Sequence, residues 1–373
     1  MDLQTRLVSI ARRVPRASLL VVLASLVVVG GTGTTSPVRE IAVGSSQSKR
    51  APAHVSAPSP EPGAVKPVAA IEAVSLASRA HTVLFGAWVK PRGSETHQQA
   101  VTRMEAEIGR RFSIDHVYHG WNGPLIGSYE RWSASRGHTL LINWKAAYDN
   151  ANGESNGAGG GYVRWADIAA GKYDADIAAR AREIKRFKKI VYLNFHHEPE
   201  DDQDTPGQRK AGTPADYRAA WRHIRAIFRS QHVTNVRFVF ILMGWTYRSG
   251  HAAQWYPGSR VIDIVGADAY NWFGTAHPGS HGWTTFASAF HAAQQFAAAK
   301  GKTFWVAETG AMEDRSRPSR RPEWYRAIAG QVRSWGNVGA VVFFMGGRYG
   351  WYPDSSGRSL AAFNALAHDT LFK

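Results

Sequence analysis

The fold of this chain is decided by three successive stretches: IVYLNFHHEPE (190–200), TPADYRAAWRHIRAIF (213–228) and VRFVFILMGW (236–245). The first begins with an apolar run and the third is apolar almost throughout, which is typical of parallel strands covered on both faces. The middle stretch opens with Thr213 and Pro214, a favourable N-cap and first helical residue. Four of its large side chains fall on one helical face: Tyr217, Trp221, Ile224 and Phe228. The three stretches therefore predict a strand, a helix and a second parallel strand.

The same alternation extends over the chain from His81 onward. Eight short apolar runs occur, each followed by room for a helix: Val83–Val89, Ile114–Tyr118, Thr139–Trp144, Ile190–His196, Val236–Trp245, Val261–Tyr270, Thr303–Glu308 and Ala340–Met345. Helical patterns also cover Ala287–Ala299 and Glu323–Trp335. Eight such units predict an α/β fold, the (β/α)8 TIM barrel. The alternative is a doubly wound open sheet, although no G-x-G-x-x-G follows the first run, as a dinucleotide-binding version would require.

Composition favours a single large folded domain. Of the 373 residues, 44% are hydrophobic and 20% are charged, which excludes a disordered chain, a collagen-like chain and a polytopic membrane protein. The first aromatic residue is Phe85, although the chain contains 14 Trp, 13 Tyr and 16 Phe. A segment of about eighty residues without an aromatic side chain does not build a core of its own. We therefore expect one domain over residues 81–373, with aromatic side chains left over for a binding surface.

The aromatic-free N-terminal part divides into two segments. In residues 1–31, four arginines precede the apolar run Leu19–Val29, whose length suits a secretory signal peptide and is too short to span a bilayer. No clean A-x-A cleavage site follows, so an uncleaved membrane anchor formed by residues 17–31 is the alternative. Residues 32–80 are rich in Ala, Ser, Val and Pro, which is typical of an extended linker. We therefore expect a secreted, extracellular protein.

The cysteine content and the net charge limit the kinds of ligand and partner that the protein can bind. The chain has no cysteine, which excludes disulfides, thiolate metal sites and cysteine nucleophiles. The net charge of the chain is +16. Residues 1–80 contain nine Lys and Arg and four Asp and Glu, which gives them a net charge of +5 and leaves +11 for the domain. No dense Lys/Arg run and no nucleic-acid-binding motif accompanies this charge. We therefore expect a basic monomer without nucleic acid or cofactor, with nucleic-acid binding as an alternative.

Two of the predicted strands end in a glutamate. The fourth run leads into NFHHEP (194–199), which contains Glu198, and the seventh ends in VAETG (306–310), which contains Glu308. A lone glutamate at a strand end is usually a helix cap or an ion-pair partner. Two glutamates on opposite sides of the mouth of a barrel are the pair that retaining glycoside hydrolysis requires. We therefore assign Glu198 and Glu308 as candidate catalytic residues.

Aromatic residues gather at the same strand ends. Five lie at or just beyond a predicted strand and are assigned to substrate binding: Trp88, Trp144, Trp245, Tyr270 and Trp272. Three more lie in the following loops: Trp121, Trp283 and Trp351. Flat aromatic side chains pack against the C–H faces of sugar rings, although any single one equally suits core packing. Tyr270 could also donate a hydrogen bond that keeps Glu308 ionised, while Asp268, on the same strand face, is interpreted as structural.

Two adjacent histidines precede Glu198. The side chains of His196 and His197 should point to opposite sides of the strand, so we expect no metal ion in the site. We assign His197 to contact with the substrate or to orientation of Glu198. The acidic loop 200–204 lacks the EF-hand pattern, and we interpret it as solvated rather than as a calcium site.

Four motifs together resemble glycoside hydrolase family 26, especially its secreted bacterial members: NFHHEPE (194–200), WYPGSRVIDIVGADAYNW (255–272), VAETG (306–310) and WYPDSSGRSLAAFNALAHDTLF (351–372). The resemblance covers about residues 83–372. It implies a (β/α)8 barrel of retaining endo-hydrolases, most of which act on β-1,4-mannan and some on mixed-linkage β-glucan or β-1,3-xylan. It also implies roles for four residues: Glu198 as acid/base, Glu308 as nucleophile, Tyr270 as its hydrogen-bond partner and His197 as a substrate-site residue.

One departure from the family bears on specificity. Mannanases of the family usually continue the His-Glu with Met-Asn-Gly and a nearby Trp, whereas Pro199 and Glu200 follow here and the next Trp is Trp221. This departure affects the expectation of mannan specificity more than that of hydrolysis. We expect a secreted endo-acting retaining β-glycosidase that cleaves a polysaccharide of the mannan or β-glucan type by double displacement. The alternative from another class is a non-catalytic carbohydrate-binding barrel tethered to the cell surface.

Overall fold

The computed structural model describes residues 82–149, 161–275, 282–346 and 350–373. These residues all belong to the second of two units, residues 74–373. The predicted signal segment, residues 1–31, and the predicted linker, residues 32–80, lie outside the described residues, so both stay predictions.

Eight parallel strands form a closed barrel in sequence order. Their bounds are β1 Leu84–Val89, β2 Ile114–His119, β3 Thr139–Trp144, β4 Val191–Phe195, β5 Val236–Met243, β6 Ile264–Asn271, β7 Thr303–Ala311 and β8 Val338–Met345. The strand β1 pairs with β2 on one side and with β8 on the other. Because this pairing closes the sheet, the predicted (β/α)8 barrel is confirmed and the open doubly wound sheet is wrong. Each apolar run identified in the sequence corresponds to one of these strands.

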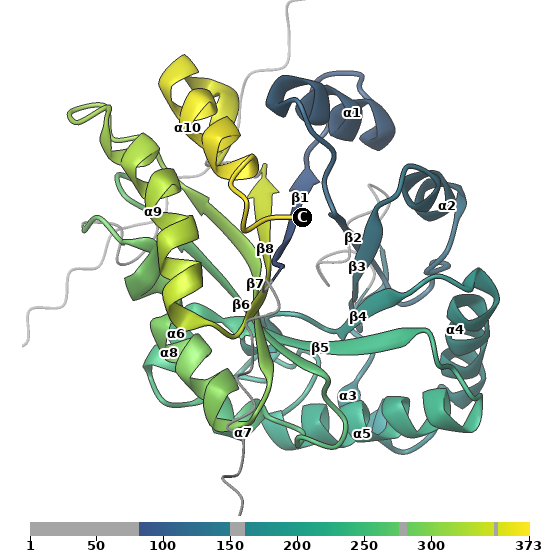
Figure 1. Ribbon diagram of the computed structural model, residues 1–373. Helices are drawn as coiled ribbons and strands as arrows, with labels where there is room; N and C mark the ends of the chain where they lie inside the picture. The colour runs from purple at the N-terminus through teal and green to yellow at the C-terminus, as the bar shows by residue number, and fades with distance from the viewer. Residues whose placement is uncertain (1–81, 150–160, 276–281, 347–349) are drawn as a thin grey trace, which may run out of the picture. The chain divides into compact units, whose positions relative to one another are not determined.

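Helices follow the strands and surround the barrel (Figure 1). The α-helices are α1 His97–Ile108, α2 Ser128–Ser135, α3 Trp165–Ala169, α4 Asp174–Phe187, α5 Pro214–Ser230, α6 Gly244–Arg248, α7 Ala252–Trp255, α8 Phe286–Ala299, α9 Arg320–Trp335 and α10 Gly357–Ala367. Two 3-10 helices, η1 Pro199–Asp202 and η2 Pro353–Ser355, follow β4 and β8. After β5, the short helices α6 and α7 stand where every other unit has a helix of at least eight residues. Within the described part of the chain, no helix combines the length and apolarity needed to cross a bilayer.

The helix α5 begins as the sequence predicts. Thr213 Oγ1 accepts the backbone N–H of Asp216 at 3.3 Å, and the Asp216 carboxylate accepts the Thr213 N–H at 3.0 Å. These reciprocal bonds satisfy N–H groups that the start of a helix otherwise leaves unpaired. The predicted apolar face is buried: Tyr217, Trp221, Ile224 and Phe228.

Apolar side chains form one layer on each side of the strands. The inner layer fills the barrel and contains Ile114, Leu141, Val239, Ile241, Ile264, Trp305, Ala307, Ala340 and Val342. The outer layer lies between the strands and the helices and includes, for example, Leu193, Val265 and Ile224. Alternate residues of each strand enter different layers, as strands covered on both faces require.

The strand β7 departs from this alternation immediately before Glu308. The register between β6 and β7 shifts so that Asp268 pairs with Glu308 and Ala307 is left without a partner. Ala307 is therefore the extra residue of a β-bulge. Trp305 and Ala307 face the inside of the barrel, so strict alternation would turn Glu308 toward the helices. The bulge instead directs Glu308 to the mouth of the barrel.

The last residues of the chain pair with the start of the barrel. Val83 N–H donates to the Leu371 carbonyl and Lys373 N–H donates to the Val83 carbonyl, both at 3.0 Å. The ring of Phe372 packs against that of Phe85 with 5.2 Å between the centroids. The two ends of the domain are thereby joined.

Candidate active site

The backbone leaves the strand conformation at the end of β4. His196 and Glu198 both adopt left-handed angles, with φ of 55° and 49°. This conformation costs a non-glycine residue about 1–2 kcal/mol and persists where the surrounding structure imposes it. As a result His197 and Glu198, although adjacent, line the same cavity. Continued strand alternation would have sent their side chains to opposite faces.

His196 turns away from the cavity and is fully buried. Its Nδ1 accepts the Ala146 N–H at 3.1 Å, and its Nε2 lies 2.9 Å from the Asp202 carboxylate. Lys145 Nζ lies 2.7 Å from the same carboxylate. Burial would raise the pKa of Asp202, but the hydrogen bonds from His196 and Lys145 lower it below its ordinary value. His196 therefore anchors the loop after β4, and the predicted separation of the two histidines is confirmed.

The acidic loop after Glu198 is built into the domain. Glu200 and Asp202 are each only 5% exposed. Asp204 accepts two hydrogen bonds from Arg164, at 2.6 and 2.7 Å. The interpretation of a solvated acidic loop is therefore wrong for these three residues, because each carboxylate meets a donor that is distant in the sequence.

Two tyrosine hydroxyls hold the Glu308 carboxylate. Tyr118 donates to Oε1 at 2.6 Å, and Tyr270 donates to Oε2. Burial raises the pKa of Glu308 to about 7, while the hydrogen bonds from both tyrosines act in the opposite direction. The predicted hydrogen bond from Tyr270 is present. Tyr118 is an additional donor that the sequence assignment missed, although it ends the second apolar run.

Glu198 has a different electrostatic environment in the same cavity. Burial raises its pKa well above the ordinary value, and the negative charges of Glu308 and Glu200 raise it further. Glu198 therefore holds its proton more tightly than Glu308, which receives two hydrogen bonds to its ionised form. Two carboxyl groups whose pKa values are separated in this way can act as an acid and as an anion at one pH.

Asp268 is a third buried carboxyl group of the cavity. It is 3% exposed, and neither carboxyl oxygen has a hydrogen-bond partner among the described residues. Burial raises its pKa well above the ordinary value, and the charges of Glu308 and Glu198 add to this effect. A buried carboxyl group without partners does not stabilise a fold. Asp268 therefore belongs to the cavity rather than to the structural framework expected from the sequence.

The cavity itself has a volume of about 670 Å³ and lies at the carboxyl ends of the strands. Its lining consists of Tyr118, His197, Glu198, Asp201, Met243, Gly244, Trp245, Arg248, Asp268, Ala269, Tyr270, Trp272, Thr284, Glu308, Phe344 and Trp351. Carboxyl groups and aromatic rings therefore share one enclosed space. This combination suits a sugar, which presents both hydroxyl groups and apolar C–H faces.

Four of the predicted substrate-binding residues line the cavity: His197, Trp245, Tyr270 and Trp272. Trp245 is 45% exposed, so much of its indole is open to a ligand. Trp351, noted in the sequence as a loop aromatic, stacks on Tyr270 with 4.1 Å between the centroids. The cavity therefore combines residues that follow β4, β5, β6 and β8.

Trp144 and Trp88 do not line the cavity. Trp144 is fully buried in the outer layer and stacks on Trp121 at a centroid distance of 4.4 Å, so the prediction that it contacts the substrate is wrong. Trp88 stacks on Phe344 with 4.4 Å between the centroids, and of the two only Phe344 lines the cavity, so the predicted contact of Trp88 is corrected as well. Position at a strand end does not distinguish the inner face from the outer face, which explains both errors.

Other lining residues gave no clear signal in the sequence. Phe344 and Met243 are apolar residues within apolar runs, so the sequence alone suggests that they belong to the hydrophobic core. Arg248 lies in α6, beyond the run from which the fifth strand was predicted. Their contribution becomes visible only when the strands are assembled in space.

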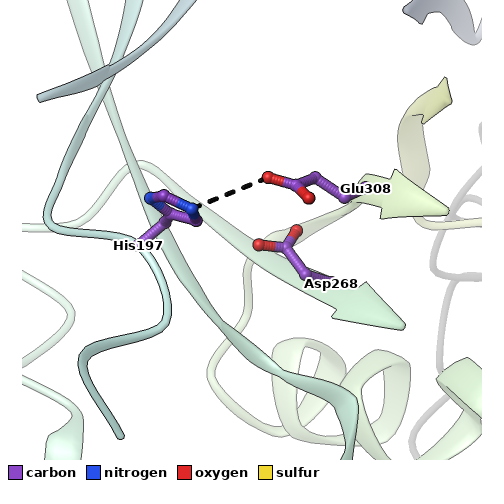
Figure 2. Close-up of side chains that lie close together, drawn as sticks. All are labelled: His197, Asp268 and Glu308. Carbon is purple, nitrogen blue, oxygen red and sulfur yellow. Dashed lines mark ion pairs between the residues drawn. The ribbon is translucent and has the colours of Figure 1, made fainter. Parts of the chain in front are cut away.

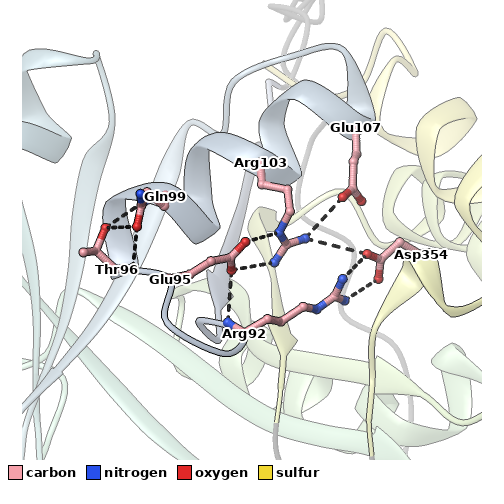
Figure 3. A network of polar contacts seen from close by, with 7 residues as sticks. All are labelled: Arg92, Glu95, Thr96, Gln99, Arg103, Glu107 and Asp354. Carbon is pink, nitrogen blue, oxygen red and sulfur yellow. Dashed lines mark hydrogen bonds and ion pairs between the residues drawn. The ribbon is translucent and has the colours of Figure 1, made fainter.

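A network of ion pairs fixes the segment that follows Trp351 (Figure 3). Arg92 donates two hydrogen bonds to Asp354, at 2.7 and 2.8 Å, and its guanidinium lies 4.5 Å from the ring centroid of Tyr352. Arg103 of α1 lies 3.7 Å from the same carboxylate. The network therefore ties η2 to α1 and to the segment between β1 and α1.

His197, Asp268 and Glu308 are the group in the described residues that could hold a metal ion (Figure 2). One ligand atom of each lies within 4.8 Å of the others, and His197 Nε2 is 3.8 Å from Glu308 Oε1. Zinc ligands at about 2.0–2.2 Å from the ion would have to move closer together. Both Glu308 oxygens already accept tyrosine hydrogens, and His197 Nδ1 lacks the hydrogen bond that usually orients a ligating histidine. The arrangement therefore suits a metal ion poorly.

A closed eight-stranded barrel in which two glutamates after β4 and within β7 face one aromatic cavity has the architecture of a barrel glycoside hydrolase. Residues 168–305 match the model of glycosyl hydrolase family 26. Endoglucanase H of Acetivibrio thermocellus is 29% identical over 292 residues, which are 75% of this chain and 30% of that protein. The chain is therefore similar to this family over the middle of its barrel, and it spans less than a third of the length of this relative.

Solved structures with the same fold include several mannanases. A family 26 β-mannanase from Bacteroides ovatus superposes with a TM-score of 0.53 at 15% identity, covering 79% of this chain and 90% of the other. The catalytic domain of an endo-β-1,4-mannanase from Bacillus sp. JAMB-750 gives 0.55 at 16% identity, with coverage of 79% and 88%. A modular endo-β-1,4-mannanase from Cellulomonas fimi gives 0.56 at 16% identity, with coverage of 79% and 72%. At these identities the similarity establishes the barrel fold.

Proposed function

We propose that this protein is an endo-acting retaining β-glycosidase that cleaves a β-linked polysaccharide by double displacement. The observation that carries the proposal is the unequal environment of Glu198 and Glu308 in one cavity. Glu198 keeps its proton because of burial and nearby negative charge, whereas the ionised form of Glu308 receives two tyrosine hydrogen bonds. A proton donor and an anionic nucleophile are the two groups that this reaction needs.

In the first step, a Glu308 oxygen attacks the anomeric carbon as the bond to the leaving oxygen breaks. The leaving oxygen takes the proton of Glu198, so a glycosyl ester of Glu308 and an anionic Glu198 remain. The tyrosine donors are matched to this step: they stabilise the carboxylate before attack and still orient it when one oxygen becomes bonded to the sugar.

In the second step, Glu198 removes a proton from water, which attacks the anomeric carbon and displaces Glu308. The product has the same anomeric configuration as the substrate, because two inversions cancel. Glu198 ends the cycle protonated and Glu308 ends it ionised, which agrees with the higher pKa of Glu198.

The substrate class follows from the relatives and from the cavity. One relative is named an endoglucanase and the three solved structures described above are mannanases, so we propose β-glucan or mannan as the polysaccharide. The indoles of Trp245 and Trp272 offer surfaces for sugar rings, while Trp351, which is 5% exposed, stacks on Tyr270 in the wall of the cavity. Pro199 and Glu200 stand where mannanases of the family usually have other residues, which favours β-glucan.

The proposal is tested by the products formed from β-1,4-mannan, mixed-linkage β-glucan and β-1,3-xylan. We expect oligosaccharides of several lengths from at least one of them, with the β-anomer formed first in proton NMR. Glu308→Ala should lower kcat at least about a thousandfold while leaving the thermal unfolding cooperative. Binding of a glycan without cleavage of any would instead identify a carbohydrate-binding barrel.

The two carboxyl groups can be told apart with azide. In Glu308→Ala, azide should replace the carboxylate and yield an α-glycosyl azide after a single inversion. In Glu198→Ala, cleavage of an aryl glycoside with a good leaving group should survive and azide should yield the β-glycosyl azide, because such a leaving group needs no proton donor and azide needs no base. The opposite pattern would exchange the two assignments.

We further propose that the protein is exported and acts outside the cell as a monomer. The support is the apolar run Leu19–Val29 after four arginines, within residues that the structure leaves undescribed. Fractionation of the source cells should place the protein in the medium, or in the membrane fraction if residues 17–31 remain as an anchor. Recovery from the cytosol would contradict the proposal.

A further inference from the structure

Glu200 joins the loop after Glu198 to the first turn of α6. Its Oε1 accepts the backbone N–H of Met243 at 3.0 Å and the hydroxyl of Thr246 at 2.5 Å. Glu200 is 5% exposed and Thr246 is fully buried, so water does not compete readily for these bonds. The contact links residues that follow two neighbouring strands, β4 and β5.

These two bonds fix the start of a very short helix. Met243 is the N-cap of α6 and its side chain provides no capping hydrogen bond. The first N–H groups of a helix have no partners within it, and a glutamate three residues into the helix often accepts the N-cap N–H. Glu200 performs this function from another part of the chain.

Trp245 lies between the two residues that Glu200 holds. It lines the cavity and is 45% exposed, and its indole Nε1 donates to the Met243 sulfur at 2.7 Å. An exposed indole has little packing of its own to define its direction. Its orientation therefore depends on the backbone of Met243 and Thr246, which Glu200 constrains from both sides.

The same short segment carries the proposed proton donor. Glu198 lies two residues before Glu200, and Pro199 between them begins η1 with a fixed φ angle. The position of the carboxyl group of Glu198 and that of the indole of Trp245 are therefore linked through one rigid turn and two hydrogen bonds.

The function of Glu200 does not require its charge. Burial raises the pKa of Glu200 to about 7, although the hydrogen bonds from Thr246 and Met243 lower it. A carbonyl oxygen of a protonated carboxyl group or of an amide accepts the same two bonds. Glutamine is therefore the conservative replacement at this position and alanine the disruptive one.

We propose that Glu200 is a positioning residue that holds Trp245 in the wall of the cavity and thereby sets the affinity for the sugar that packs on it. The inference rests on the proposed function, since it names a determinant of substrate binding in that site. Glu200 touches neither the substrate nor the reacting atoms, and it acts through Met243 and Thr246.

The test compares Glu200→Ala with Glu200→Gln on the glycan that the wild-type protein cleaves. Glu200→Ala should raise KM about tenfold and change kcat less than about threefold, because a misplaced indole weakens binding more than chemistry. Glu200→Gln should stay within about twofold of the wild type in both constants. An unchanged KM in Glu200→Ala, or an equal defect in Glu200→Gln, would overturn the proposal.

Glu105 provides the matched control. It is also a glutamate with 5% exposure that accepts a backbone N–H, that of Phe112 at 3.0 Å, but it lies outside the cavity lining. Glu105→Ala should lower the Tm without raising KM. If Glu200→Ala does not fold, Thr246→Val removes one of the two donors without changing the shape of the side chain, and it should raise KM in the same direction but less.

Hydrogen exchange supplies a readout that does not depend on turnover. In Glu200→Ala, amide exchange should accelerate in the peptide that covers residues 243–248 and stay unchanged in the other strands and helices. Acceleration spread over the whole domain, as in Glu105→Ala, would show a merely structural role and would overturn the proposal. Should the wild-type protein cleave no glycan, the proposed function fails, while the exchange pattern still decides whether Glu200 holds α6.

Discussion

Glu198 and Glu308 are chemically identical side chains in one cavity, and their surroundings make them different. Burial raises the pKa of both, but hydrogen bonds from Tyr118 and Tyr270 favour the ionised form of Glu308 alone. The tyrosines are therefore as important to the proposed chemistry as the carboxyl groups. Tyr118 comes from β2 and Tyr270 from β6, so the donors approach Glu308 from two sides of the barrel.

Removal of one of these donors should change the pH dependence of catalysis. In Tyr118→Phe the pKa of Glu308 should rise, because a hydrogen bond to the ionised form is lost. Since the nucleophile must be ionised, the acidic limb of the kcat/KM profile should move to higher pH, and the maximal rate should fall about tenfold to a hundredfold.

The control for this variant is Tyr129→Phe. Tyr129 also donates to a carboxylate, that of Asp115 at 2.8 Å, but neither residue lines the cavity. Tyr129→Phe should leave the acidic limb in place. An unshifted limb in Tyr118→Phe would mean that this hydroxyl does not control the ionisation of Glu308.

Asp268 should reduce stability at neutral pH. Its pKa is near 3.8 in an unfolded chain and is raised in the native protein, so above pH about 3.8 the unfolded state releases a proton that the native state keeps. Stability is therefore lost as pH rises toward the native pKa. Asp268→Asn should raise the Tm at pH 7 by at least about 2 °C and bring little gain at pH 3.5, as measured by calorimetry.

The contrasting variant is Asp115→Asn. The pKa of Asp115 is raised by burial to about 6, but its carboxylate accepts hydrogen bonds from Ser133 and Tyr129. Because these hydrogen bonds limit the rise of the pKa, Asp115→Asn should bring a smaller gain at pH 7 than Asp268→Asn. Equal stabilisation by both substitutions would show that hydrogen bonding does not distinguish the two acids.

At the scale of the element, β7 combines a bulge with a close contact. The bulge at Ala307 returns Glu308 to the inner side, and Gly310, two residues later, approaches Trp351. A Cβ atom added at Gly310 would lie 2.7 Å from the Trp351 Cβ, closer than real Cβ atoms come. The absence of a side chain at Gly310 therefore lets Trp351 reach its stacked position on Tyr270.

Gly310→Ala should displace Trp351 and weaken substrate binding. We expect KM to rise about fivefold or more while kcat changes less, because the indole moves and the carboxyl groups stay. Gly330→Ala is the control, since nothing lies within 4 Å of an added Cβ there and alanine is the better helix former in α9. A wild-type KM in Gly310→Ala would show that the wall formed by Trp351 does not contribute to binding.

At the scale of the whole molecule, the barrel is closed by contacts between residues distant in the sequence. The C-terminal residues pair with Val83, and Arg92 binds Asp354 (Figure 3). Both contacts support the junction of β1 and β8, where the sheet closes on itself. The domain therefore depends on its last residues as well as on its strands.

Phe372→Ala should destabilise the domain as a whole. The side chain is 7% exposed and packs on Phe85, and truncation of a buried phenylalanine costs about 3 kcal/mol or more. The Tm should fall by about 6 °C or more. Ile190→Ala is the control because Ile190 is 41% exposed, and it should change the Tm by less than about 2 °C.

The search for polar and aromatic residues at strand ends located most of the candidate site. It could not tell which of these side chains face the inside of the barrel. Glu198, Glu308, Tyr270 and Trp245 were found because polar or aromatic residues interrupt or end apolar runs. Trp144 satisfied the same rule and is nevertheless core, because a strand buried on both sides has no polar face to mark its direction. Strict alternation along β7 would place Glu308 on the outer side, and the bulge that turns it inward leaves no mark in a run of apolar residues.

The sequence by itself determined the number and order of the strands and the two glutamates at strand ends, while the pairing of β1 with β8 decided between a closed barrel and an open sheet. The sequence could do so because apolar periodicity and strand-end polarity are local properties of the chain. Only the tertiary structure decided which residues meet: Tyr118 beside Glu308, Glu200 against Thr246, and Asp268 without a hydrogen-bond partner in the described part of the chain. These contacts arise from strand register, a bulge and two left-handed residues, each of which depends on packing between segments that are far apart in the sequence.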